Sequence, residues 1–348
     1  MLFIGYSILT GVGFGILYMG TVTIVSLWFD RYRATACGIA VSGNGTGTFF
    51  NAFILEFFIQ LAGWRSAMLF EAAVAAQCCI CAMFLRPPPP VKNTAAVKQS
   101  EEEETSILKT DIKVEDSHHQ QHSFIDVCKE LIVSPRFLGF FINNLTWPLG
   151  VMVFYSFAVR VAIKEAEFVV SDAVWAVSII GLVDGAARIV FGVTGSMLRI
   201  PATYFYYFGQ LGVGLVITTT PYIYHTISPF LASVLFGIFF GAQIGSLVPA
   251  TAELFDSEKI SSILGILIVA NGISAGVGPI ISDLLLQALN ESYRPVYLIV
   301  GLLLLAGLMV ITPLLIKHWR KLQKVNSAKK QTAKTIDVLQ ADGQNDEL

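Results

Sequence analysis

The sequence predicts an all-α membrane protein of about nine transmembrane helices. Of its 348 residues, 54% are hydrophobic and only 14% are charged, whereas soluble domains carry about 25% charged residues. Nine stretches reach the roughly 20 apolar residues that a helix needs to cross the hydrocarbon core. The net charge of -2 offers no basic field for nucleic acid, so the chain is not expected to bind it.

The nine expected spans follow one another with few polar interruptions. They cover roughly residues 2–28, 35–60, 64–85, 137–159, 172–193, 203–223, 229–252, 260–288 and 295–316. The first stretch has no basic segment before it and no cleavage site after it, so we expect a retained helix rather than a signal peptide. Several spans are rich in glycine, which favours close helix packing in membranes.

The basic residues predict how the chain is oriented. Connections on one side of the spans hold 18 of the 23 lysine and arginine residues. The positive-inside rule therefore places the long loop after residue 85 and the C-terminus in the cytosol.

Charge and hydropathy divide the chain into four regions. Residues 1–85 form a partial N-terminal bundle of three helices, and residues 136–317 form a C-terminal bundle of six. The segment 86–135 is low in hydrophobicity and predicts a largely disordered cytosolic linker, and 318–348 predicts a disordered cytosolic tail. The linker histidines are better explained as solvated residues than as metal ligands, so neither metal nor cofactor is expected.

One pair of charges lies in the middle of the fifth span. Asp184 and Arg188 are separated by four residues, which places them on one helix face. They are either a structural ion pair or a site for substrate and proton, because arginine matches a carboxylate with two parallel hydrogen bonds. Glu71, midway along the third span, is a further candidate proton site or a buried acid bonded to a neighbour.

Residues 28–44 resemble a signature of the monocarboxylate transporter family of the major facilitator superfamily. The matching positions are Phe29, Arg31, Arg33, Ala36, Gly38, Ala40 and Gly43. The positions that depart from it are Tyr32, Thr35, Ser42 and Asn44. The Asp184-x-x-x-Arg188 spacing is also similar to that family, in the helix that the family numbers eighth.

The resemblance implies a two-bundle transporter and a set of roles. Asp184 and Arg188 would bind substrate and proton, Phe239 and Phe240 would lie near the substrate path, and Arg31 and Arg33 would act in gating. Core packing is the favoured explanation for the two phenylalanines, because aromatic side chains at helical spacing usually pack. Positive-inside topology is slightly favoured over gating for the two arginines. Aligned with the family, the chain begins at the fourth of twelve helices, so the first three are expected to be missing.

The function implied is proton-coupled symport of small monocarboxylates such as lactate or pyruvate, by alternating access at the plasma membrane. A single-span accessory glycoprotein is an implied partner. Two alternatives remain open: a carrier of another organic solute such as an aromatic amino acid, and a truncated membrane scaffold that transports nothing. An enzyme is not expected, since the spans contain no motif such as His-Glu-x-x-His.

Overall fold

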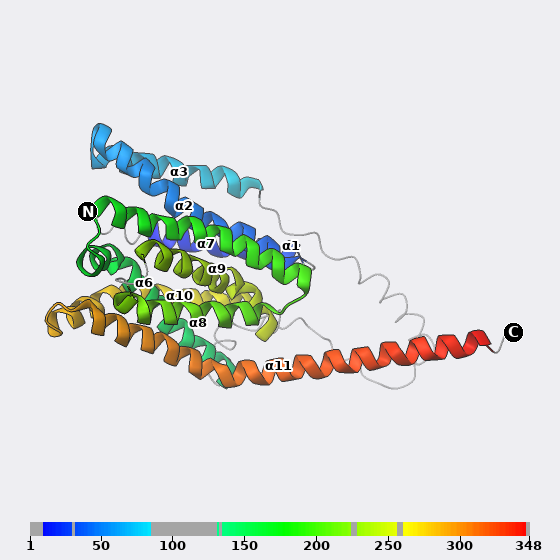
Figure 1. The fold of residues 1–348 in the computed structure, drawn as a ribbon. Coiled ribbons are helices and arrows are strands. Elements are labelled where there is room, and N and C mark those ends of the chain that lie inside the picture. The colour runs from blue at the N-terminus through cyan, green and yellow to red at the C-terminus, as the bar shows by residue number, and fades with distance from the viewer. Residues whose placement is uncertain are drawn as a thin grey trace.

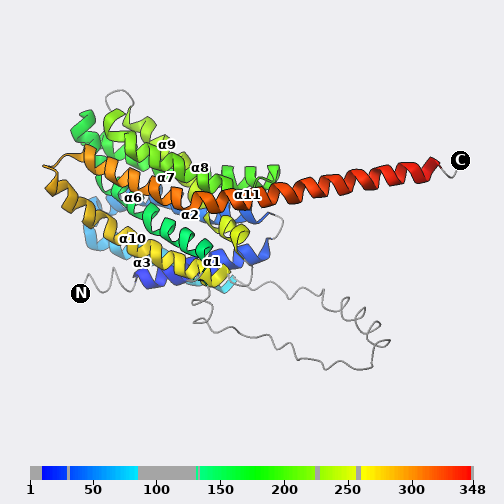
Figure 2. The same ribbon diagram turned by 90° about the horizontal axis from the view of Figure 1, so that it is seen from below.

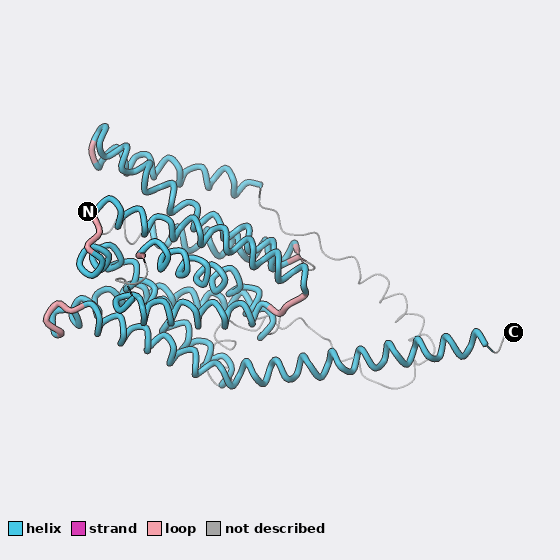
Figure 3. The backbone as a smooth tube through the Cα atoms, in the orientation of Figure 1, coloured by secondary structure: helices cyan, strands magenta, loops and turns pink. Residues whose placement is uncertain are grey.

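The computed structural model describes residues 10–29, 32–84, 131, 134–223, 228–255 and 260–345. Within these residues the chain is helical, with short connections between helices (Figure 3). The predicted linker at 86–135 lies almost entirely outside the described residues.

The described part of the chain contains nine helices, and the described residues of each expected span lie in one of them; residues 2–9 of the first span and residue 85 of the third lie outside the described residues. The elements are α1 (Thr10–Trp28), α2 (Arg33–Ala62), α3 (Trp64–Phe84), α6 (Pro135–Ala166), α7 (Val170–Leu198), α8 (Ala202–Ile223), α9 (Pro229–Leu254), α10 (Ile260–Ala288) and α11 (Tyr293–Asn345). Six are long and apolar enough to cross a membrane, namely α3, α6, α7, α9, α10 and α11. A shorter apolar stretch, Thr10–Val25, lies in α1. The all-α membrane fold is confirmed.

Local sequence explains where several helices begin and end. Pro135 and Pro229 occupy the first turns of α6 and α9, where a missing N–H costs nothing. Gly63, at φ 77°, ends α2 and turns the chain directly into α3. At the other end of the bundle, the Glu253 carboxylate accepts hydrogen bonds from the first backbone N–H groups of α8, at 2.7 Å from Ala202 and 3.1 Å from Thr203.

The helices run side by side as one elongated bundle, with α3 at its outer edge beside α2 (Figures 1 and 2). Among the described residues of α3, only Ala67 is buried. The C-terminal helices hold the largest hydrophobic core, which includes Phe154, Phe236 and Tyr297. The rings of Phe154 and Phe236 stack at 4.1 Å.

The last helix differs from the expectation of a disordered tail. α11 continues without a break from Tyr293 to Asn345 and extends well beyond the bundle (Figure 1). The disorder predicted for residues 318–348 is therefore wrong for 318–345. The reason is local: lysine, glutamine, alanine and leucine favour helix, and no proline or glycine interrupts the sequence between Pro313 and Gly343.

Small residues allow α2 of the N-terminal part to approach α7 of the C-terminal part. A methyl group on Gly45 would lie 2.6 Å from both the Gly181 oxygen and the Gly185 nitrogen. One on Gly38 would lie 2.6 Å from the Arg188 carbonyl oxygen. Hydrogen bonds also cross here, since the Thr35 hydroxyl donates to the Gly192 carbonyl at 3.1 Å. This contact joins the two halves of the chain.

We predict that Gly45→Ala separates α2 from α7 and lowers the thermal unfolding midpoint of the detergent-purified protein by several degrees. Overpacking of this kind costs about 1–3 kcal/mol. Gly47→Ala on the same helix is the matched control, because no atom lies within 4 Å of its added methyl group. Equal midpoints for the two variants would contradict the close contact of α2 and α7.

Candidate substrate and proton site

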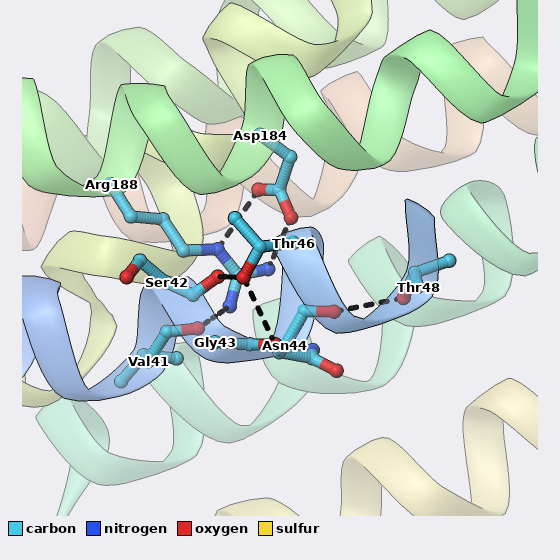
Figure 4. Close-up of polar contacts among 8 residues, drawn as sticks. All are labelled: Val41, Ser42, Gly43, Asn44, Thr46, Thr48, Asp184 and Arg188. Carbon is cyan, nitrogen blue, oxygen red and sulfur yellow. Dashed lines mark hydrogen bonds and ion pairs between the residues drawn. The ribbon is translucent and has the colours of Figure 1, made fainter. Parts of the chain in front are cut away.

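The only ion pair with both side chains buried among the described residues is formed by Asp184 and Arg188, one turn apart on α7 (Figure 4). The guanidinium donates through Nε to Asp184 Oδ1 at 2.9 Å and through Nη2 to Asp184 Oδ2 at 2.7 Å. The two residues are 2% and 1% exposed. Two parallel bonds neutralise both charges locally, which offsets their removal from water.

The third nitrogen of the guanidinium, Nη1, forms a hydrogen bond to another helix. Arg188 Nη1 donates to the backbone carbonyl of Val41 on α2 at 2.8 Å. A carbonyl oxygen can accept a second hydrogen bond beside its helical one. Figure 4 shows the pair facing the α2 segment from Val41 to Thr48, where Thr46 turns its hydroxyl back to the Ser42 carbonyl. Arg188 thus links the two halves of the chain through a polar contact.

The other side of the pair is covered by α9. A methyl group on Gly241 would lie 2.6 Å from the Asp184 carbonyl oxygen, and one on Gly245 would lie 3.3 Å from the Arg188 Cα. Phe240 lies next to Arg188, with its ring centre 5.8 Å from the guanidinium carbon. Its ring also neighbours Trp147, Tyr155 and Phe236, at 6.3, 6.3 and 5.6 Å. The pair is therefore bordered by aromatic rings on one side and by α2 on the other.

The other candidate residues lie in different places. Phe239 faces away from the pair: its ring packs on Gly212 and lies 5.2 Å from the Phe208 ring, between α8 and α9. Glu71 of α3 is half-buried, and its Oε1 accepts a hydrogen bond from the Asn51 amide of α2 at 3.1 Å. Arg31 lies outside the described residues, and Arg33 is the first residue of α2.

Sequence reasoning missed the Val41 carbonyl and the neighbouring rings of Trp147 and Tyr155. A backbone acceptor carries no signal in its side chain, and Val41 is 147 positions from Arg188. The only signal in the sequence was the run of small residues in 38–47, which indicates a helix that another helix can approach closely.

In the part of the chain that the structure describes, no three His, Cys, Asp or Glu side chains come together as a metal site would require.

Comparison with known protein families identifies the superfamily of the chain. The family model described as Major Facilitator Superfamily matches residues 1–248 and 175–341. The chain belongs to the major facilitator superfamily. It is an integral membrane protein of a transporter superfamily rather than an enzyme, as the sequence predicted.

Curated relatives narrow the resemblance within the superfamily. Monocarboxylate transporter 12 of Xenopus laevis is 27% identical over 311 residues, covering 86% of this chain and 65% of its own length. The human monocarboxylate transporter 12 is 27% identical over 355 residues, covering 96% and 66%. The predicted resemblance to monocarboxylate transporters is confirmed, and the chain spans about two thirds of the length of these relatives.

A solved structure supports the fold. The proton:xylose symporter XylE, bound to 6-bromo-6-deoxy-D-glucose, superposes with a TM-score of 0.57 at 14% identity. The match covers 84% of this chain and 66% of that one. At this identity the likeness concerns the major facilitator fold alone.

We predict that Asp184 and Arg188 depend on each other for stability. Removing one partner of a buried pair costs about 3–5 kcal/mol, because the other charge stays buried without compensation. Arg188→Met should therefore lower the unfolding midpoint more than the double variant Asp184→Asn/Arg188→Met does.

The pair of exposed Arg294 and partly buried Glu165, at 2.8 Å, provides the control. Arg294→Met should change stability by no more than about 1 kcal/mol. The coupling is disproved if the stability lost in Asp184→Asn/Arg188→Met equals the sum of the losses in Asp184→Asn alone and Arg188→Met alone.

Proposed function

We propose that the chain carries small monocarboxylates such as lactate or pyruvate across the membrane together with a proton, by alternating access. The observation that carries this proposal is the buried Asp184–Arg188 pair, whose third contact is made to the opposite half of the chain. A charge near the middle of a membrane is costly, and such charges usually mark a substrate or ion pathway.

Arg188 is suited to the carboxylate of a substrate. Its planar fork already holds one carboxylate through Nε and Nη2, at 2.9 and 2.7 Å. A substrate carboxylate has the same geometry and would form the same two hydrogen bonds. The substrate would therefore replace Asp184 on the Arg188 fork rather than join it.

Exchange of carboxylates explains why a proton would travel with the substrate. If Asp184 gave up its place while still ionised, one carboxylate would remain buried without a counter-charge, which is strongly unfavourable. A proton taken up by Asp184 removes that cost. One proton would then enter with each monocarboxylate, and the loaded site would stay neutral overall.

Alternating access would act through the contact of α2 and α7. In this structure the pair is closed off from solvent, since both residues are almost fully buried. The Val41 carbonyl holds Arg188 against α2, so movement of the guanidinium toward a substrate would weaken that link between the two halves of the chain.

The remaining candidate residues take separate roles in this proposal. Phe240 would line the substrate path beside Arg188, whereas Phe239 would pack between helices. We assign gating to Arg31 and Arg33, and a secondary proton site to Glu71.

The cellular setting follows from charge distribution and family resemblance. The excess of basic residues supports a cytosolic long loop and C-terminus. We further propose, on family resemblance alone, that the chain resides in the plasma membrane and associates with a single-span accessory glycoprotein.

The aromatic rings beside Arg188 favour a second candidate substrate class. Phe240 offers an apolar face next to Arg188, and the rings of Trp147 and Tyr155 adjoin that of Phe240. Aromatic amino acids present a carboxylate and a ring together, so they belong in the same assay.

Uptake in proteoliposomes tests the proposal. We expect labelled lactate or pyruvate to accumulate when the outside is acidic, and accumulation to stop when an ionophore removes the proton gradient. Arg188→Lys should reduce uptake by about tenfold or more, because lysine cannot form two parallel bonds, which are together worth over 1.4 kcal/mol.

Phe239→Leu is the matched control, since Phe239 faces α8 and should affect uptake far less than Phe240→Leu. Uptake of aromatic amino acids alone would redirect the proposal to the second substrate class. Lactate uptake that Arg188→Ala leaves unchanged would contradict the role of Arg188, and absence of uptake for every substrate would favour the scaffold alternative.

A further inference from the structure

A second group of buried polar side chains lies inside the C-terminal bundle, away from the ion pair. It consists of Asn143 on α6, Tyr206 and Gln210 on α8, and Gln243 on α9, which we call the amide cluster. Each is at most 1% exposed. In the bundle interior such groups need hydrogen-bond partners as much as charges need counter-charges.

Contacts between the three helices bring these residues together. The Tyr206 hydroxyl donates to Asn143 Oδ1 at 2.8 Å, and the Gln243 side chain neighbours the same hydroxyl. Gln210 follows Tyr206 by one helical turn and shares its face of α8. The backbones of α8 and α9 meet here, since a methyl group on Gly209 would lie 2.5 Å from the Gln243 nitrogen.

The cluster is separate from the substrate site. Gly241 and Gly245 face Asp184 and Arg188 from α9, whereas Gln243 lies between them in sequence and so points to the opposite side of that helix. Surrounding residues are apolar and include Phe140, whose ring centre is 5.6 Å from that of Tyr206. The cluster is enclosed by α6, α8 and α9.

Direct bonds leave much of the cluster's hydrogen-bonding capacity unused. Asn143 Nδ2 and both polar atoms of Gln210 have no protein partner, and the Gln243 amide has only the neighbouring Tyr206 hydroxyl. The adjacent Asn144 shows the contrast. Its Nδ2 donates to the Phe140 carbonyl at 2.8 Å, and its Oδ1 accepts from Trp147 Nε1 at 3.2 Å. Buried amides without partners are the exception in folded proteins, and ordered water is their usual complement.

We propose that the amide cluster binds internal water, on the order of two molecules given about three hydrogen bonds for each buried water. The ligand is neutral because the cluster holds no formal charge. It is small because the α8 and α9 backbones are in contact at Gly209 and Gln243. Bound water would satisfy the free amide groups and add to the direct Tyr206–Asn143 bond in holding α6, α8 and α9 together.

Radiolytic footprinting of the full chain in detergent tests this proposal. Brief X-ray exposure generates hydroxyl radicals from bound water as well as bulk water, and mass spectrometry reports oxidation of each tyrosine. We expect Tyr206 to be oxidised several-fold faster than Tyr297. Tyr297 is equally buried but lies in the apolar core, with its hydroxyl directed to the Phe154 carbonyl.

A double substitution tests whether the water is bound by the two glutamine amides. Gln210→Met/Gln243→Met should reduce Tyr206 oxidation to the rate of Tyr297, and exposed Gln287→Met is the matched control that should change neither. The proposal is overturned if Tyr206 in the unmodified protein is oxidised no faster than Tyr297, a comparison that needs no variant to fold. It is also overturned if the double variant folds and leaves Tyr206 oxidation unchanged.

Discussion

The cost of a charge inside a membrane is the constraint on which the arrangement of this chain depends. Arg188 meets it with three hydrogen bonds, two to Asp184 and one to the Val41 carbonyl. Because the third bond leaves α7 for α2, neutralising the charge also joins the two halves of the chain. If Arg188 binds a substrate anion, as proposed, that binding is coupled through the same guanidinium to the contact that alternating access would change.

Close approach of helices makes these bonds possible. Glycines at 38 and 45 bring α2 against α7, and glycines at 241 and 245 bring α9 against its other side. Membrane helices gain little from burying apolar side chains against one another rather than against lipid, so short contacts and polar bonds carry more of the association. The small residues thus have a structural purpose here, which is to enclose the ion pair between α2 and α9.

Local features were predictable from sequence, and long-range ones were not. The positions of the helices and the pairing of Asp184 with Arg188 depend on hydropathy and on a spacing of four residues. The Val41 carbonyl, the opposite directions of Phe239 and Phe240, and the amide cluster depend on how distant helices pack. The expected disorder after residue 317 was wrong through residue 345, because low hydrophobicity was given more weight than a helix-forming composition without proline or glycine.

The central claim is that Asp184 leaves Arg188 and takes up a proton when a monocarboxylate binds. Difference infrared spectroscopy of the protein in lipid, with and without isotope-labelled lactate, measures this directly. The account predicts that binding removes a carboxylate band and adds a protonated carboxyl band, and that both changes are absent in Asp184→Asn. A bound substrate with the Asp184 carboxylate band unchanged would contradict it.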